Sequence, residues 1–277
     1  MRAGAAAGHG ETMKPAQALH EAGQSLWLDN ITRALLEEGI LPRYVAEYSV
    51  TGLTSNPTIF DRAIKDGTAY DADIAARKAS GATDEQVFFD LALADLRRAA
   101  GLFAPVHGRT DGVDGWVSLE VSPLLAHDTP RTVDQAESLH REAALSNLFI
   151  KIPGTAEGLP AIEECIYAGV PVNVTLLFSA EQYRAAAEAY QFLPADGGDA
   201  DQVIAAFAQA GIDTAILAAE LQRQGAEAFA ASWQDLLARI GACSAPSWST
   251  LARPGCCARA GSRSRSRSAT TWPRPAS

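Results

Sequence analysis

The chain has 277 residues, of which 47% are hydrophobic, 20% charged and 7% aromatic. This length and composition allow a sizeable hydrophobic core and exclude a collagen, a coiled coil and a wholly disordered chain. No long uninterrupted apolar run occurs, so we expect no membrane-spanning helix and no membrane partner. The N-terminal residues also lack the apolar stretch of a secretory signal.

The net charge of −10 is distributed unevenly. Residues 1–240 contain 17 of the 23 basic side chains and all 33 acidic ones, whereas residues 241–277 contain six arginines and no acid. An acidic body argues against nucleic acid as a partner, because nonspecific binding needs a basic face. Three of the four cysteines lie in the last stretch and Cys165 is alone in the body, which indicates a reducing, cytoplasmic location without a disulfide framework.

Short apolar runs alternate with longer helical patterns up to residue 190, which is typical of an α/β fold with a parallel sheet. Five strands are predicted, at 25–29, 50–56, 115–121, 147–153 and 170–178. Helices are predicted at 16–22, from 31 to Gly39, from Pro57, and at 83–102, 132–145, 155–167 and 179–190. Thr83 and Gln86 have the spacing of a capping box, which sets the start of the longest of these helices.

After residue 190 the alternation stops. Residues 193–201 read as a turn-rich linker, and three helical stretches follow up to residue 240. The remaining residues are rich in Ser, Arg, Pro and Gly and have no apolar periodicity, so we expect them to be disordered. Their Ser-Arg repeat would suit an RNA-contacting segment, but the abrupt change of composition favours a non-native tail, such as a shifted reading frame would produce.

Polar side chains fall at or near the carboxyl ends of the predicted strands, the end that carries the active site in a parallel β/α barrel. They are Asp29, Thr54, Asn56, Glu120, Lys151, Asn173 and Thr175. Each has an ordinary explanation when taken alone. Asp29 would cap the next helix, Asn56 before a proline would form a turn, and Thr175 is a common strand residue. Their occurrence together indicates a site.

Lys151 indicates a particular chemistry. It is one of four lysines and stands in Leu-Phe-Ile-Lys-Ile-Pro, a strand of the kind that is buried on both faces. Burial disfavours the ammonium form, and a neutral amine attacks a carbonyl to form a Schiff base. The alternatives are a lysine that extends to solvent and one that pairs with Glu120. With Asp29 and Glu120 nearby as proton donor and acceptor, imine chemistry is favoured.

Five segments resemble those of transaldolases, most closely the longer bacterial branch. They are SLWLDNITRALLEEG, YSVTGLTSNPTIF, VSLEVSP, NLFIKIPGTAEGLPAIEECI and VPVNVTLLFSAEQY. The resemblance covers residues 25–190, and residues 193–242 resemble the C-terminal helices of that branch. It implies a (β/α)8 barrel of the TIM type with class I aldolase chemistry, incomplete at about five β/α units, with extra C-terminal helices.

The resemblance also implies roles for the polar residues. Lys151 would form the Schiff base with a ketose phosphate, and Asp29 would act as acid and base when the C–C bond breaks and forms. Glu120 would manage protons at the imine through a water molecule that Thr175 holds.

The substrate contacts are implied in the same way. Asn56 and Asn173 would hydrogen-bond hydroxyls of the dihydroxyacetone unit, with Thr54 beside them. The substrates would be sugar phosphates. No metal or organic cofactor is expected, because the lysine imine itself is the electron sink.

The chain also departs from the family pattern. Strands six to eight, with the serine and arginines that hold the substrate phosphate, have no counterpart, and Arg223 and Arg239 are the only arginines between residues 190 and 240. We therefore divide the chain into a partial barrel (1–190), a helical segment (191–242) and a tail (243–277).

Three hypotheses follow. The first is a transaldolase that moves a three-carbon unit from sedoheptulose 7-phosphate to glyceraldehyde 3-phosphate, giving erythrose 4-phosphate and fructose 6-phosphate. The second is a catalytically impaired, truncated relative of such an enzyme, either a deleted and frame-shifted product or a module that needs a partner to complete its barrel. The third is a small class I Schiff-base aldolase, which cleaves its substrate without transferring the fragment.

Overall fold

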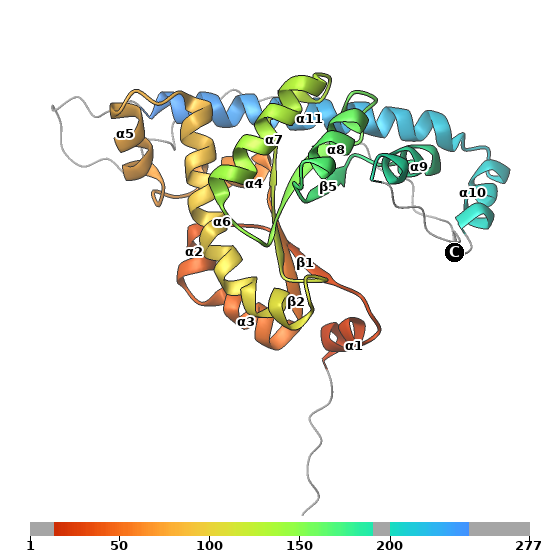
Figure 1. The fold of residues 1–277 in the computed structure, drawn as a ribbon, viewed down its shortest axis with the longest axis horizontal. Helices are drawn as coiled ribbons and strands as arrows, with labels where there is room; N and C mark the ends of the chain where they lie inside the picture. The colour runs from red at the N-terminus through yellow and green to blue at the C-terminus, as the bar shows by residue number, and fades with distance from the viewer. Residues whose placement is uncertain (1–13, 191–199, 244–277) are drawn as a thin grey trace, which may run out of the picture.

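The computed structural model describes residues 14–190 and 200–243, which form one parallel sheet with helices around it (Figure 1). The strands are β1 (Leu26–Asp29), β2 (Val50–Thr54), β3 (Trp116–Glu120), β4 (Leu148–Pro153) and β5 (Val172–Thr175). The helices are α1 (Pro15–Glu21), α2 (Arg33–Glu37), α3 (Ile40–Tyr48), α4 (Pro57–Lys65), α5 (Asp71–Ala79), α6 (Asp84–Arg109), α7 (Thr129–Ala143), α8 (Gly158–Tyr167), α9 (Ala180–Ala189), α10 (Ala200–Gln209) and α11 (Thr214–Ala242), with a 3-10 turn, η1 (Pro123–Leu125).

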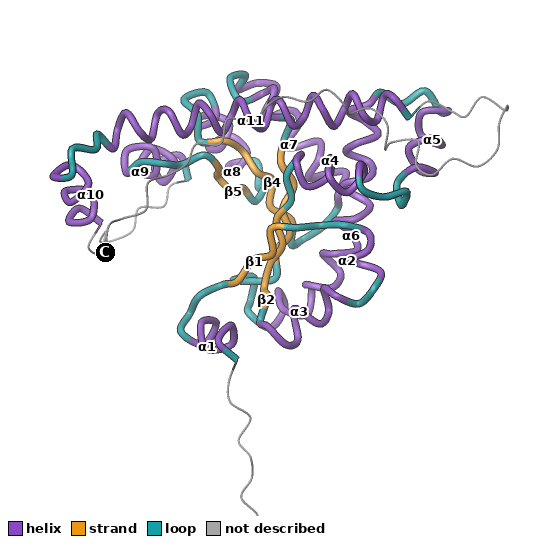
Figure 2. The backbone as a smooth tube through the Cα atoms, turned by 180° about the vertical axis from the view of Figure 1, so that it is seen from behind, coloured by secondary structure: helices purple, strands orange, loops and turns teal. Residues whose placement is uncertain are grey.

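The sheet is an incomplete β/α barrel. Its strands lie in the order β1-β2-β3-β4-β5, and every neighbouring pair is parallel. Each helical connection therefore leads to the adjacent strand, as in a TIM barrel. The sheet lies at the centre of the molecule (Figure 2). The sequence predicted this fold class and all five strands, and the structure confirms both.

The outer face of the sheet forms the hydrophobic core with the helices. The fully buried members of this face are Leu53, Val117, Leu119, Leu148, Ile150 and Ile152. Helices α6, α7 and α8 pack against β3 and β4 on this side. A strand covered in this way reads as a continuous apolar run, which explains why the sequence signal for β4 was strong.

Aromatic side chains cover the amino-terminal part of the inner face. Trp116 stacks on Phe149 with 4.0 Å between the ring centroids, and Trp27 also stacks on Phe149, at 6.2 Å. Gly52 makes this packing possible, because a Cβ atom at that position would lie 2.4 Å from the Trp27 ring. These three rings therefore cover the inner face at the amino-terminal ends of the strands.

Two predicted helices are longer than expected, and two helices were not predicted. Helix α6 begins with the predicted Thr83 capping box but continues past residue 102 to Arg109. In the described part after residue 200 there are two helices where three were predicted, because α11 runs through Gly225 without a break. A Cβ at Gly225 would lie 2.8 Å from the Leu176 side chain, so this glycine serves close packing. Helices α3 and α5 were not predicted, although at nine residues each they are as long as α4.

Helix α11 crosses the carboxyl end of the sheet (Figure 1). Trp233 on its inner side is fully buried between Phe88 and Phe89 of α6. Closer to its C-terminus, Arg239 pairs with Asp61 of α4 at 2.7 Å. Helix α11 is therefore part of the same packed unit as the sheet.

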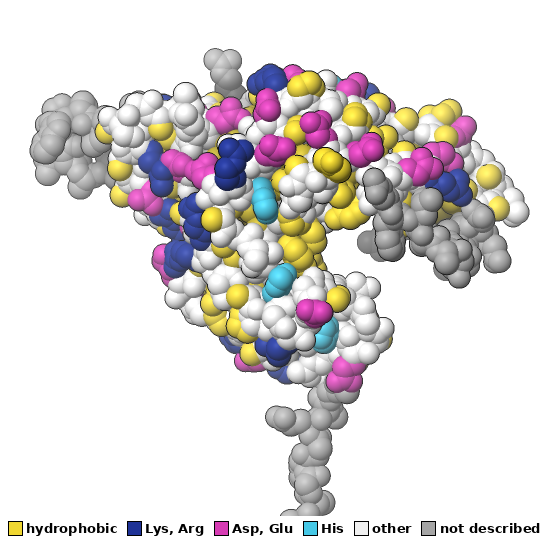
Figure 3. Space-filling model, viewed as in Figure 1, with side chains coloured by type: hydrophobic (Ala, Val, Ile, Leu, Met, Phe, Trp, Pro, Cys, Tyr) yellow, Lys and Arg dark blue, Asp and Glu magenta, His cyan; other side chains and the backbone are white. Residues whose placement is uncertain are grey.

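The surface near β5 is apolar. Phe178, Tyr183, Leu217 and Leu221 are all substantially exposed, and hydrophobic side chains gather in the hollow below α8 in the view of Figure 3. Within the described ranges, no helix is both long and apolar enough to span a bilayer. Most of the predicted linker and all of the predicted tail beyond Cys243 lie outside the described residues.

Candidate active site

The strand register brings the predicted polar residues onto one face of the sheet. Glu120 of β3 aligns with Lys151 of β4, which aligns with Asn173 of β5. On the other side, Asp29 of β1 aligns with Thr54 of β2. Aligned residues of parallel strands point to the same face, so these five side chains share the inner face.

Lys151 is buried on this face and makes two polar contacts with described residues. Its Nζ donates to the backbone carbonyl of Ser55 at 3.0 Å and lies 3.7 Å from Glu120 Oε2. Only 9% of its side-chain surface is exposed, so the solvent-extended alternative for this lysine is wrong and the pairing with Glu120 is confirmed. Because Ser55 follows β2 and lies two strands from Lys151, this bond also shows that the face is concave.

Glu120 is the second buried ionisable group of the site. It is 5% exposed, and burial raises the pKa of its carboxyl, while the nearby Lys151 charge opposes this and the Asp29 charge adds to it. Its Oε2 atom is buried and has no hydrogen-bond donor among the described residues. A carboxyl in this setting can hold a proton at a higher pH than an exposed one.

Asp29, Asn173 and Thr175 are the remaining predicted site residues at the ends of β1 and β5. Asp29 is exposed at the end of β1, and helix α2 is capped by the Thr32 side chain, so the helix-cap explanation of Asp29 is wrong. Asn173 is half-buried beside Lys151. The Thr175 hydroxyl oxygen is buried and has no hydrogen-bond partner among the described residues.

Asn56 and Thr54 already have partners in the fold. The Asn56 side-chain oxygen accepts from the backbone N–H of Ile59, so Asn56 caps α4, whereas its local explanation was a turn. Its amide N–H groups stay free of that bond. The Thr54 hydroxyl accepts from the Ser118 hydroxyl at 3.0 Å.

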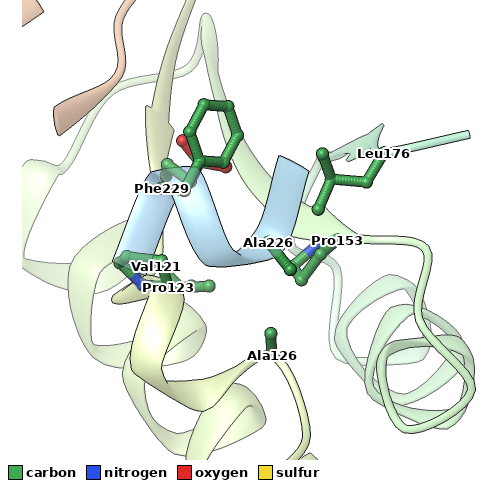
Figure 4. Close-up of a pocket in the computed structure, with 8 residues that line it drawn as sticks. Val121, Pro123, Ala126, Pro153, Leu176, Ala226 and Phe229 are labelled. Carbon is green, nitrogen blue, oxygen red and sulfur yellow. The ribbon is translucent and has the colours of Figure 1, made fainter. Parts of the chain in front are cut away.

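Helix α11 covers the carboxyl end of the sheet. Ala226 and Phe229 of α11 line a small pocket together with Glu120, Pro153 and Leu176, and Figure 4 shows Phe229 and Ala226 on the helix side of it. The Gln222 amide donates to the carbonyls of Gly154 and Leu176, both at 2.9 Å, which ties α11 to the ends of β4 and β5.

The two arginines singled out from the sequence do not face the site. Arg223 is exposed on α11 and pairs with Glu220 and Glu227 of the same helix. Arg239 pairs with Asp61 of α4. Both are therefore engaged in the helical layer, as their helical sequence context indicated.

Sequence reasoning missed two serines at the site. Ser55 supplies the carbonyl that binds Lys151, and Ser118 lies on the inner face with no exposed surface. A backbone carbonyl carries no signal of residue type. Ser118, however, precedes Glu120 by two residues in a strand, and that spacing alone puts it on the same face.

Comparison with known proteins identifies the family. Residues 26–208 match the family model described as transaldolase/fructose-6-phosphate aldolase. The chain belongs to this family. It is 48% identical over 177 residues to a transaldolase of Arthrobacter sp. and 47% identical over 176 residues to one of Thermobifida fusca, in each case covering 64% of this chain and 48% of the relative. It is 42% identical to a transaldolase of Saccharopolyspora erythraea, over 72% of this chain and 56% of the relative.

The match is partial on the side of the relatives. The chain spans about half the length of the curated transaldolases that it matches. The matched part includes all five strands and every candidate site residue, from Asp29 to Thr175. The transaldolase-like part of the chain is therefore the part that bears the candidate chemistry.

Proposed function

We propose that this chain is a transaldolase that transfers a dihydroxyacetone unit through a Schiff base on Lys151. The donor would be sedoheptulose 7-phosphate and the acceptor glyceraldehyde 3-phosphate, giving erythrose 4-phosphate and fructose 6-phosphate. The observation that carries the proposal is a buried amine, Lys151, paired with a buried carboxyl, Glu120, on the inner face of a β/α sheet. The names of the relatives support the same reaction.

Lys151 would act as the nucleophile. Its side chain is 9% exposed, and its surroundings supply one carbonyl acceptor and one carboxyl neighbour. The amine attacks the ketone carbon of the sugar, and the resulting carbinolamine loses water to form the imine. The imine then accepts the electron pair of the C–C bond that breaks.

Glu120 and Asp29 would divide the proton transfers. Glu120, whose pKa burial raises, can protonate the departing hydroxyl of the carbinolamine, directly or through a water molecule held by the Thr175 hydroxyl. Asp29 lies at the open end of β1. Its carboxylate would take the proton from the sugar hydroxyl as the C–C bond breaks, and return a proton when the new bond forms.

Asn173 and Asn56 would orient the substrate. Asn173 aligns with Lys151 on the next strand, so its amide lies beside the position of the imine. Asn56 uses its oxygen for the α4 cap and keeps its N–H groups for a sugar hydroxyl. Thr54 would complete this side from β2.

The experiment that tests the proposal is reductive trapping. Incubation with fructose 6-phosphate and borohydride should add the reduced dihydroxyacetone or hexose unit to Lys151, which peptide mass spectrometry would locate. The Lys151→Met variant should acquire no label, and Lys65→Met, which removes an exposed lysine, should label like the parent. Folded parent protein without label at Lys151 would overturn the proposal.

A second candidate is an impaired transaldolase, and the ion pairs of Arg223 and Arg239 favour it. Arg223 and Arg239 are both paired in the helical layer and neither faces the inner sheet. Phosphate binding depends on charge-assisted hydrogen bonds, so a site without them should bind sugar phosphates weakly. Trapping yields that are equal for fructose and fructose 6-phosphate would support impairment. A clear preference for the phosphate ester would refute it.

Cleavage without transfer distinguishes the third hypothesis, the small aldolase. With fructose 6-phosphate alone, an aldolase releases free dihydroxyacetone, whereas a transaldolase releases it only slowly. With erythrose 4-phosphate added as acceptor, a transaldolase should form sedoheptulose 7-phosphate. Comparing the two product sets assigns the reaction.

A further inference from the structure

Ser55 joins three strands of the site. It is 1% exposed and follows the last residue of β2. Its hydroxyl donates to the backbone carbonyl of Ser118 on β3 at 2.9 Å, and its own carbonyl accepts from Lys151 Nζ of β4 at 3.0 Å. Ser55 therefore links the end of β2 to β3 through its hydroxyl and to the amine of Lys151 on β4 through its carbonyl.

The hydroxyl of Ser55 lies beyond the last backbone pair of the β2–β3 ladder. Pairing between β2 and β3 ends at Leu53 and Val117, whereas pairing between β3 and β4 continues to Glu120 and Lys151. Beyond Leu53, side-chain hydroxyl groups hold the two strands together. The Ser55 hydroxyl thus determines where its own backbone carbonyl lies relative to the amine.

The carbonyl in turn fixes the direction of the amine. Lys151 Nζ donates to the Ser55 carbonyl at 3.0 Å, and the Glu120 oxygen lies farther away at 3.7 Å. An N–H group that points to the Ser55 carbonyl limits rotation about the Cε–Nζ bond. When the amine attacks the ketone, its lone pair must then be directed away from the Ser55 carbonyl.

We propose that Ser55 is a positioning residue for Lys151, which sets the direction of the amine through the Ser55 carbonyl and holds that carbonyl through the Ser55 hydroxyl. The inference rests on the proposed Schiff-base function for its catalytic consequence. Its structural part concerns only the folded protein, so the two parts can be tested separately.

Three variants test the proposal. Ser55→Ala removes the hydroxyl, and Ser55→Thr keeps it. Thr132→Val is the matched control, because the Thr132 hydroxyl is also buried and donates to a backbone carbonyl, that of Leu125, at 2.9 Å without touching Lys151. Ser55→Cys, which keeps the size and has only a weak donor, replaces Ser55→Ala should the alanine variant fail to fold.

The structural readout is the nuclear magnetic resonance signal of the Lys151 side chain. The chain has four lysines, so 13Cε labelling of lysine gives few signals, and Lys151→Met assigns the one of interest. We expect this signal to move in Ser55→Ala and to stay in place in Ser55→Thr and Thr132→Val. An unmoved signal in folded Ser55→Ala overturns the proposal.

The catalytic readout is the rate of borohydride trapping at saturating fructose 6-phosphate. Displacement of a reacting group by about 1 Å costs up to ~100-fold in rate, so we expect Ser55→Ala to lose about 10- to 100-fold, with half-saturation changed less than about twofold. Ser55→Thr should recover most of the loss. An unchanged rate in Ser55→Ala overturns the positioning role while the proposed function stands. Absence of label in every protein overturns the proposed function, and the Lys151 signal then decides the structural part alone.

Discussion

Removing the positive charge of Lys151 should leave a buried carboxylate without its counter-charge. Lys151 and Glu120 keep 9% and 5% of their side-chain surface, and they face each other across β3 and β4 at 3.7 Å. The perturbation is Lys151→Met, which keeps the length of the side chain and much of its apolar surface. The loss of folding stability then comes from an ionised Glu120 that stays buried without a counter-charge.

The magnitude follows from the separation of the charges. At an effective dielectric constant of about 20, unit charges 3.7 Å apart attract by ~4.5 kcal/mol. Breaking one partner out of a buried pair typically costs 3–5 kcal/mol, so the two approaches agree. We expect Lys151→Met to lower the free energy of unfolding by about 3–5 kcal/mol near pH 8.

The loss should shrink as the pH falls. Burial raises the pKa of Glu120, and the charge of Lys151 opposes that rise, so its removal should raise this pKa further. A carboxyl with a raised pKa in the folded state gives a stability that is present at low pH and lost as the pH rises through that pKa. As the pH falls, more of the variant's carboxyl holds its proton and needs no partner, so the difference from the parent should be smaller at pH 5 than at pH 8.

The assay is urea unfolding followed by far-UV circular dichroism at pH 5, 6, 7 and 8. Lys65→Met serves as the control, since Lys65 is exposed and the change should cost almost nothing. The double variant with Glu120→Gln should recover most of the stability, because no charge is then left buried. A Lys151→Met protein as stable as the parent at pH 8, or a double variant no better than the single one, would refute the reasoning.

Three further changes have defined outcomes in the same assay. Trp233→Ala should cost about 3–5 kcal/mol, while Trp233→Phe should cost clearly less, since the buried indole N–H has no acceptor among the described residues; equal losses would contradict this. Gly52→Ala should cost ~1–3 kcal/mol and change the near-UV dichroism, because its Cβ would lie 2.4 Å from the Trp27 ring. Tyr70→Phe should cost ~1.5–3 kcal/mol by removing the 2.7 Å bond to Asp95, and an unchanged midpoint would count against that bond.

The sequence predicted the sheet and most of the site because both have strong local signals. Strand β4 is a run of apolar residues interrupted by one lysine, and the polar residues of the other strands lie at the same relative position. In a parallel sheet this position is one end of one face, so Asp29, Glu120 and Lys151 could be grouped without coordinates. Their roles remain predictions.

The features that escaped prediction depend on contacts between distant segments. The Ser55 carbonyl is a backbone group, and its bond to Lys151 joins residues 96 positions apart. Asn56 could be read as a turn residue or as a substrate ligand, and only the bond to Ile59 shows that it caps α4. The continuity of α11 through Gly225 depends on Leu176, which is far away in sequence.

The burial of Lys151 does not require a closed barrel. Below it, the inner face is covered by Trp27, Trp116 and Phe149, and the carboxyl end is covered by α11, which carries Phe229. The amine is thus shielded by the aromatic rings and the helix while β1 and β5 each pair on one side only among the described strands. The proposed imine chemistry would use this shielded amine, whereas phosphate recognition needs cations, and Arg223 and Arg239 of α11 are held in ion pairs within α11 and with Asp61 of α4. We therefore expect the fragment-binding chemistry and the affinity for phosphate esters to be separable in this chain, with the first retained and the second weak.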